Sequence, residues 1–209
     1  MQDSDRLRNA LRRDFPNVVP SIDRAWSRAP ALRVIDCVLS LNRNYDRFVV
    51  PRLNAFEHRF PQAISICQRR DLIASYDSPD AFVRDALNYR HADRAHTLSQ
   101  VVEYVVGTVV GNRQIEELER LRLWVVVARP SDYQTLGIRG FGLAGFQYLR
   151  MLFGANTTKP DVHICRYVQV ALGRRVSDTE ALTLLEEAVR GDSIKLRDID
   201  TMIWEHSAR

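Results

Sequence analysis

Lysine, clustered cysteine and long apolar runs are what this sequence has least of. Of its 30 lysine and arginine residues, only Lys159 and Lys195 are lysines. Cys37, Cys67 and Cys165 are odd in number and far apart, which argues against a disulfide framework and against the clustered thiolates of an iron–sulfur site. No apolar run approaches the roughly 20 residues that span a membrane, and the first residues lack a signal-peptide pattern. We therefore expect that the thiols are free, that the chain has no membrane segment, and that the protein resides in the reducing cytoplasm.

Common catalytic patterns are missing as well. Nothing resembles a phosphate-binding nucleotide loop or a Ser/His/Asp triad. His91 and His96 lie off a common helical face, which disfavours a metal site. We expect no metal ion bound by side chains.

What the chain does have is positive charge carried by arginine. Its net charge is +4 over 209 residues, and its sequence pI is about 9.2. The guanidinium fork binds phosphate in a bidentate manner, so this balance suits a polyanionic partner. A GC-rich genome would enrich arginine equally, and both explanations stay open.

The spacing of apolar residues predicts helices throughout. The most apolar segment, Ala31–Leu41, is expected to be a buried helix. Residues 125–127 are valine-rich like a strand, but the charged and apolar sides of 112–128 favour a helix. The predicted helices cover 3–15, 21–28, 31–41, 48–60, 78–87, 92–106, 112–128, a short segment from 130, 143–153, 162–172, 178–190 and 196–206. The expected fold class is all-α.

The stretch from Leu136 to Tyr167 has the most informative pattern. It contains the glycine hairpin 138–142, then an apolar helix, and further on Asp161. Glycine lacks a Cβ atom and so permits a tight turn with exposed backbone. The free amides at the start of the next helix lie at the positive end of its dipole, where a DNA phosphate fits.

This stretch resembles the helix-hairpin-helix-GPD superfamily of DNA glycosylases, the endonuclease III-like group. Ile138-Arg139-Gly140-Phe141-Gly142 matches the family's hairpin, with Arg139 in place of the usual proline, and Asp161-Val162-His163 matches its catalytic segment. Bifunctional members carry a lysine where this chain has Ala144. The resemblance spans almost the whole chain and implies a monofunctional enzyme without an iron–sulfur cluster.

The same resemblance implies a two-lobed fold with the DNA and a flipped base in the cleft between the lobes. Residues 29–158 would form a helical barrel lobe, with the hairpin at about 130–153. Residues 1–28 and 159–209 would form the second lobe, which carries Asp161. The implied partner is double-stranded DNA, bound by a monomer at the nucleoid. The family's monovalent cation at the hairpin is compatible with this sequence.

The implied reaction is hydrolysis of an N-glycosidic bond, which leaves an abasic site. The carboxylate of Asp161 would stabilise positive charge on the sugar and orient the attacking water. Aspartate after proline is also a common helix N-cap, and it is the upstream hairpin that favours the catalytic interpretation. His163 is expected to support the helix start rather than to act as a base.

Further site residues follow from phosphate binding and base extrusion. An amide, apolar or aromatic side chain must fill the gap left by a flipped base, although ordinary loop or core roles explain the same residues equally well. The phosphate-binding candidates are Arg139, Gly140, Gly142, Ala144 and Lys159, with Arg43 and Arg90; the pocket and wedge candidates are Asn42, Tyr45, Leu87 and Tyr89.

Two other functions stay open. One is a DNA-binding module that kept the hairpin and lost catalysis, against which the presence of Asp161 argues. The other is a bifunctional lyase that uses Lys159, which is displaced from the family's lysine position. The sequence also leaves two substrate classes open. One is an alkylated purine, which implies repair, and the other is a bulky modified pyrimidine, which implies defence against viral DNA.

Overall fold

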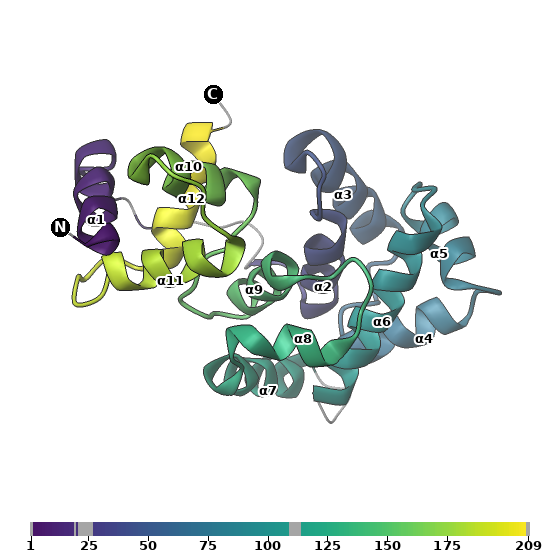
Figure 1. The fold of residues 1–209 in the computed structure, drawn as a ribbon. Coiled ribbons are helices and arrows are strands. Elements are labelled where there is room, and N and C mark those ends of the chain that lie inside the picture. The colour runs from purple at the N-terminus through teal and green to yellow at the C-terminus, as the bar shows by residue number, and fades with distance from the viewer. Residues whose placement is uncertain (1, 19, 21–26, 109–113, 208–209) are drawn as a thin grey trace. The chain divides into compact units, whose positions relative to one another are not determined.

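The computed structural model describes residues 2–18, 20, 27–108 and 114–207, and these fold into helices without a strand. The all-α expectation is confirmed. The chain divides into two compact units: a terminal unit, Met1–Ile22 with Ala155–Arg209, and a central unit, Asp23–Gly154. Figure 1 shows that helices from both ends of the sequence make up the terminal unit.

Helix α2 (Pro30–Leu39) forms the centre of the central unit. Nine of its ten residues are buried, so it is apolar on all sides, as a helix surrounded by others must be. Pro30 stands in its first turn, where a missing amide hydrogen costs nothing. The helices packed against α2 are α3 (Val50–Arg59), α4 (Ile66–Ala74), α6 (Ala92–Thr108), α7 (Gln114–Val127) and α9 (Leu143–Leu152).

Shorter elements complete the central unit. A π-helical turn, η2 (Tyr45–Val49), leads directly into α3. Helix α5 (Pro79–Ala86) packs on α4 and α6. A 3-10 turn, η3 (Pro130–Asp132), runs into the four-residue helix α8 (Tyr133–Leu136), which precedes α9. The glycine hairpin is therefore the α8–α9 connection.

The terminal unit is built from α1 (Asp3–Asp14), α10 (Val162–Leu172), α11 (Asp178–Ala188) and α12 (Leu196–Ser207). Arg8 ties the two ends of the chain together, because its Nε donates to the carbonyl oxygen of Ala188 at 2.7 Å. This bond satisfies a carbonyl at the end of α11 that has no partner within its own helix. The apolar core includes Leu7, Leu11, Phe15, Ile164, Val168, Leu172, Leu185, Ile199 and Ile203.

Helix α4 was not predicted from the sequence. Its apolar residues do not gather on one face, so periodicity gives no indication of it. The Ser65–Gln68 capping box at its start is a local pattern that predicts a helix here. The helix predicted over 21–28 falls largely on residues 21–26, outside the described ones, as do the first two residues of the one predicted over 112–128.

Within the described ranges, no helix has the length and apolarity needed to cross a membrane. Over the same residues, no group of three or more His, Cys, Asp or Glu side chains is arranged to hold a metal ion.

Candidate functional site

The hairpin between α8 and α9 consists of successive backbone turns whose conformations glycine readily adopts. Gly137 ends α8 in the left-handed region at φ 61°. The amide of Phe141 then donates to the carbonyl oxygen of Ile138 at 3.2 Å. Gly140, the third residue of that turn, has φ 76°, a value that side chains with a Cβ atom rarely adopt.

Helix α9 begins with its first amides uncapped by a side chain. Its N-cap residue is Gly142, which is exposed and has no side chain to accept those hydrogen bonds. Arg139 and Gly140 are exposed beside it, and Ala144 is partly exposed. Uncapped amides at a helix N-terminus carry partial positive charge and suit an anion.

A third glycine, Gly145, allows the first turn of α9 to approach its neighbours closely. A Cβ atom at this position would lie 2.9 Å from the ring of Phe141 and 3.0 Å from the side chain of Leu41. The thiol of Cys37 donates to the carbonyl oxygen of Gly145 at 3.3 Å. The end of α2 and the hairpin are thus packed together, which the sequence reasoning missed.

The N-terminal part of α6 joins the hairpin to the loop after α2. Thr97 Oγ1 lies within hydrogen-bond distance of the carbonyl oxygen of Arg139, at 2.9 Å, and of that of Asp93 in its own helix, at 2.8 Å. Three residues earlier on the same helix, Arg94 Nη2 donates to the carbonyl oxygen of Leu41 at 3.2 Å. The side chain of Arg139 also reaches Asp93, with 3.8 Å between charged atoms, but both are mostly exposed and the pair adds little stability. One helix, α6, therefore contacts both the hairpin and the loop after α2, which carry predicted phosphate-binding and wedge residues.

The loop 88–91 is joined to the loop after α2 by arginine–aromatic contacts. The rings of Phe48 and Tyr89 meet edge to face at 4.8 Å. Arg52 lies 3.8 Å above the ring of Phe48 and its Nη2 donates to the carbonyl oxygen of Asn88 at 3.1 Å. Arg43 Nη2 donates to the hydroxyl of Tyr89 at 3.1 Å. We call Arg43, Phe48, Arg52 and Tyr89 the arginine–aromatic cluster.

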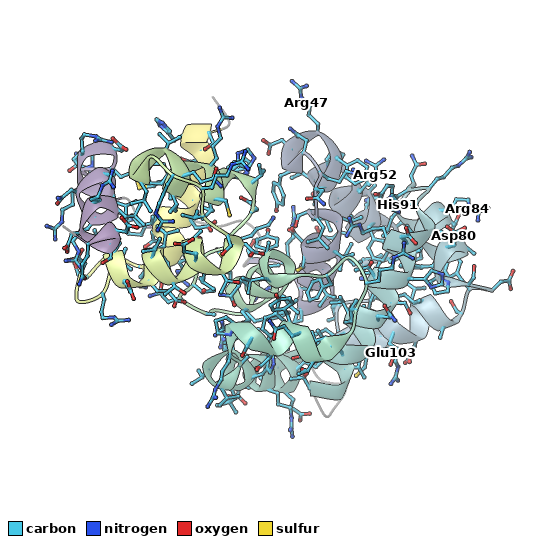
Figure 2. The ribbon with its side chains drawn as sticks, in the orientation of Figure 1. Arg47, Arg52, Asp80, Arg84, His91 and Glu103 are labelled. Atoms are coloured by element: carbon cyan, nitrogen blue, oxygen red, sulfur yellow. The ribbon has the colours of Figure 1, made fainter. Side chains whose placement is uncertain are left out.

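Two asparagines flank this cluster in left-handed conformations. Asn42 has φ 57° and Asn88 has φ 46°, the two non-glycine residues with positive φ in the described chain. Both are exposed, as are Arg43 and Arg90. Figure 2 shows Arg47 reaching away from the turn before α3. Exposed amide and guanidinium groups thus line the surface of these two loops.

Tyr45 and Leu87 lie in different surroundings from Asn42. The Tyr45 hydroxyl donates to Asp36 at 2.8 Å, and Tyr148 on α9 donates to the other oxygen of that carboxylate at 3.1 Å. Arg28 completes the group with a 3.0 Å ion pair to the fully buried Asp36. Leu87 is only 1% exposed. Tyr45 therefore serves a buried polar cluster and Leu87 the core, and neither presents a free wedge.

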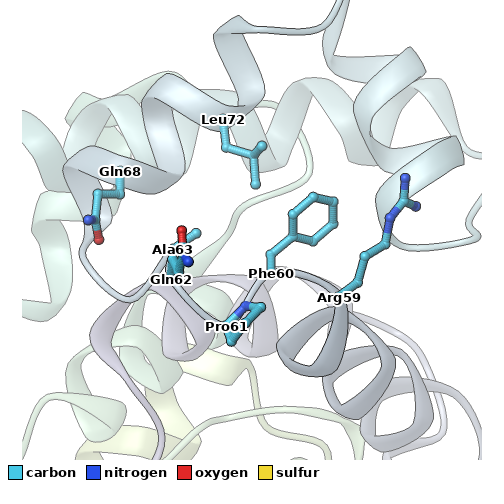
Figure 3. A pocket seen from close by; sticks show the side chains of 7 residues that line it. All are labelled: Arg59, Phe60, Pro61, Gln62, Ala63, Gln68 and Leu72. Atoms are coloured by element: carbon cyan, nitrogen blue, oxygen red, sulfur yellow. The ribbon is translucent and has the colours of Figure 1, made fainter.

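A surface pocket lies elsewhere in the central unit. It has a volume of about 450 Å³ and is open to solvent at the junction of α3 and α4 (Figure 3). Its lining contains none of the predicted site residues and no carboxylate. The residues around it are Arg59, Phe60, Pro61, Gln62, Ala63, Gln68 and Leu72. The candidate site does not include it.

In the terminal unit, Asp161 is the N-cap of α10. Its Oδ1 accepts hydrogen bonds from the amides of His163 at 2.9 Å and Ile164 at 3.3 Å. Its Oδ2 lies 3.8 Å from the Nζ atom of Lys159, and both side chains retain some exposure, 23% and 16%. The capping interpretation and the catalytic one are thus compatible, because each uses a different oxygen. His163 contributes to the helix start through its backbone amide.

The segment that leads to Asp161 is fastened to α12 by Asp200. The backbone amide of Lys159 donates to Asp200 Oδ1 at 2.7 Å, and the hydroxyl of the buried Thr158 donates to the same oxygen. Five residues before Asp161, Asn156 Oδ1 accepts a hydrogen bond from the amide of Arg197 at 3.4 Å. The sequence reasoning missed Thr158 and Asp200, because they are far apart in the chain.

Burial changes the acidity of Asp200. Although part of the residue is exposed, its carboxyl group is not, and that burial raises the pKa of Asp200 to about 7. The negative charge of Asp161 acts in the same direction. The hydrogen bonds from Thr158 and the Lys159 amide, and the charge of Lys159, oppose the rise in pKa.

The comparisons with known proteins define a family but no activity. A family model described as "Domain of unknown function (DUF8548)" matches residues 6–208. The chain therefore belongs to the DUF8548 family. No curated protein and no solved structure matches it.

Proposed function

We propose that the protein is a monofunctional DNA glycosylase, which extrudes a damaged or modified base from duplex DNA and hydrolyses its N-glycosidic bond. The observation that carries the proposal is the glycine hairpin ending at Gly142, which leaves the first amides of α9 without a side-chain cap. Together with Asp161, it is the part of the chain that resembles known glycosylases.

DNA binding is the first step of the proposal. The amides at the start of α9 would hold one phosphate, with Arg139 beside them, and such contacts position a protein without reading sequence. The loop at Asn42 is held by α6, through Arg94, and the loop at Asn88 is held by Arg52 of the arginine–aromatic cluster. Their exposed arginines would neutralise neighbouring phosphates, and Asn42 is our candidate for the side chain that fills the gap left by the base.

Bond cleavage is the second step. Departure of the base builds positive charge on the sugar, which a carboxylate nearby stabilises. Asp161 has one oxygen, Oδ2, that does not cap α10. This oxygen would face the sugar or orient the attacking water. The product would be an intact strand with an abasic site.

One observation favours a second candidate, the bifunctional lyase. Lys159 is the lysine that approaches Asp161, with 3.8 Å between Nζ and Oδ2. A lysine amine that attacked the sugar would form a Schiff base and lead to strand cleavage. Lys159 does not occupy the position of the lysine in bifunctional members, which is Ala144 here, and therefore we rank this function second.

The experiment that tests the proposal is a base-release assay on a panel of duplex oligonucleotides. The panel contains alkylated purines, oxidised pyrimidines, substituted cytosines and unmodified bases. We expect release of one modified class and an intact strand until alkali is added. Release of alkylated purines alone would support repair, and release of substituted cytosines alone would support defence. Tight DNA binding without release of any base would instead support the DNA-binding module.

A further inference from the structure

We propose that Asp200 is a positioning residue for Asp161. Its carboxyl group accepts hydrogen bonds from the side-chain hydroxyl of Thr158 and the backbone amide of Lys159, and it thereby fixes where Asp161 stands at the start of α10. The inference rests on the proposed function for its catalytic consequence, but its structural part concerns the free protein. Asp200 itself touches neither the substrate nor the reacting atoms in this account.

Two hydrogen bonds converge on one oxygen of Asp200. Asp200 Oδ1 accepts both the Thr158 hydroxyl and the Lys159 amide. Thr158 is fully buried, so its hydroxyl has no water to replace this partner if the carboxyl group is removed. A buried donor left without an acceptor is destabilising, because it has lost its water and gained no partner.

The path from Asp200 to Asp161 is short. The amide of Asp161 donates to the carbonyl oxygen of Lys159 at 2.6 Å, so a shift of the Lys159 peptide moves the Asp161 backbone directly. Between them stands Pro160, which is buried and whose ring restricts φ. The segment therefore has few other ways to place Asp161.

Helix α12, which carries Asp200, is packed firmly into the core of the terminal unit. Ile199 and Ile203, on either side of Asp200, are 2% and 0% exposed in the core of the terminal unit. The helix packs against α10, which Asp161 caps. Both ends of the connection from Asp200 to Asp161 are thus attached to the same core.

The charge state of Asp200 determines which substitution reproduces the hydrogen bonding of its carboxyl group. Two charged groups act on its carboxyl group: Asp161 at the start of α10, and Lys159 in the segment itself. Because its pKa is raised to about 7, an uncharged carboxyl group is a substantial species at neutral pH. Asparagine has the same shape and keeps the accepting oxygen. Asp200→Asn should therefore preserve the positioning, and Asp200→Ala should lose it.

The test combines hydrogen exchange in the free protein with single-turnover base release. In Asp200→Ala we expect faster exchange of the Lys159 amide, a fall in the single-turnover rate on the order of 100-fold, as misplacement of a catalytic group by about 1 Å can cause, and unchanged DNA affinity. Asp200→Asn should restore the rate to within a few-fold of the wild type.

Two substitutions of Thr158 provide a second test in case Asp200→Ala does not fold. Thr158→Val removes the hydroxyl and should slow base release at unchanged DNA affinity, whereas Thr158→Ser should not. Thr201→Val is the matched control, because the Thr201 hydroxyl bonds only within α12, to the carbonyl oxygen of Arg197. It should leave both the rate and the Lys159 exchange unchanged.

The outcomes separate this inference from the proposed function. If the wild type releases no base, the proposed function fails, and exchange of the Lys159 amide still decides whether Asp200 holds the segment. If base release is found but Asp200→Ala and Thr158→Val keep wild-type rates and normal exchange, Asp200 is not a positioning residue. Loss of activity in Asp200→Asn equal to that in Asp200→Ala would also overturn the inference.

Discussion

Lys159 and Asp161 face each other across Pro160, with 3.8 Å between Nζ of the lysine and Oδ2 of the aspartate. The other oxygen of Asp161 caps α10. One oxygen of the Asp161 carboxylate therefore caps the helix, and the other faces the positive charge of Lys159. Partly exposed ion pairs contribute little to stability, so the pair is better understood through its effect on the chemistry proposed for Asp161.

Lys159 should be dispensable for base release. With only two lysines in the sequence, Lys195→Ala is a natural control for Lys159→Ala. We expect no borohydride-trapped adduct with the wild type, and base release by Lys159→Ala within about tenfold of it, since only one partner of a partly exposed pair is lost. An adduct that disappears in Lys159→Ala but persists in Lys195→Ala would establish the lyase instead.

Gly140 should be needed for DNA binding. Gly140→Val introduces a side chain at φ 76°, and Gly173→Val introduces the same strain at φ 69° at the end of α10. Both should lose stability by about 1 kcal/mol or more. Only Gly140→Val should weaken DNA binding, by about tenfold for a loss of about 1.4 kcal/mol, and equally for all sequences, because the hairpin would contact phosphate.

Fluorescence anisotropy with labelled duplexes at several salt concentrations measures this effect. Affinity of the wild type should fall steeply with salt. A Gly140 variant that binds as tightly as Gly173→Val, or that changes sequence preference, would contradict the phosphate-binding role of the hairpin.

Asn42 can be tested as the wedge without disturbing the backbone. Glycine accepts the left-handed conformation of Asn42, φ 57°, so Asn42→Gly should remain folded. Asn88→Gly is the equivalent change on the neighbouring loop, at φ 46°. We expect Asn42→Gly to slow base release by about tenfold or more at unchanged binding to unmodified duplex. If only Asn88→Gly slows the reaction, the wedge belongs to the 88–91 loop.

Asp200 should make stability depend on pH in a defined window. Its pKa is about 7 in the folded protein and about 4 in an unfolded chain. Between these values the folded state keeps a proton that the unfolded state has lost, so the wild type loses stability as pH rises from about 4 to 7. Asp200→Asn carries no such proton. Its stability relative to the wild type should therefore rise across that window, by on the order of 4 kcal/mol, and stay constant above it.

Urea unfolding of both proteins at pH 4.5, 6 and 8 measures this difference. Thr201→Val, which adds and removes no titratable group, should differ from the wild type by the same amount at every pH. A stability difference between Asp200→Asn and the wild type that does not change with pH would show that Asp200 does not keep its proton.

The parts of the structure that sequence could predict are those coded locally. Apolar spacing predicted helices such as α2 and α6, and the glycines of the hairpin predicted a turn that Gly140 makes with a positive φ. Asp161 stands at a helix start, as its place after proline indicates. Helix α4 was missed because packing on neighbouring helices, rather than an apolar face of its own, explains its formation.

Long-range contacts explain what the sequence could not predict. Thr158 and Asp200 are 42 residues apart, and no spacing rule joins them. Tyr45 was predicted as a ring that could stack on a base, and the bond of its hydroxyl to Asp36, shared with Tyr148 from α9, has no counterpart in any local pattern. Gly145 looks like an ordinary small residue in an apolar helix until its contact with Phe141 is known.

The most direct measurement of the central claim is base release by Asp161→Asn on whichever substrate the wild type uses. Asparagine caps a helix as well as aspartate does, so α10 should stay intact and DNA affinity should persist, while the negative charge is gone. We expect the single-turnover rate to fall by at least about 100-fold, in keeping with the loss of electrostatic stabilisation of developing charge. Near-normal turnover by a folded, DNA-binding Asp161→Asn would contradict the account.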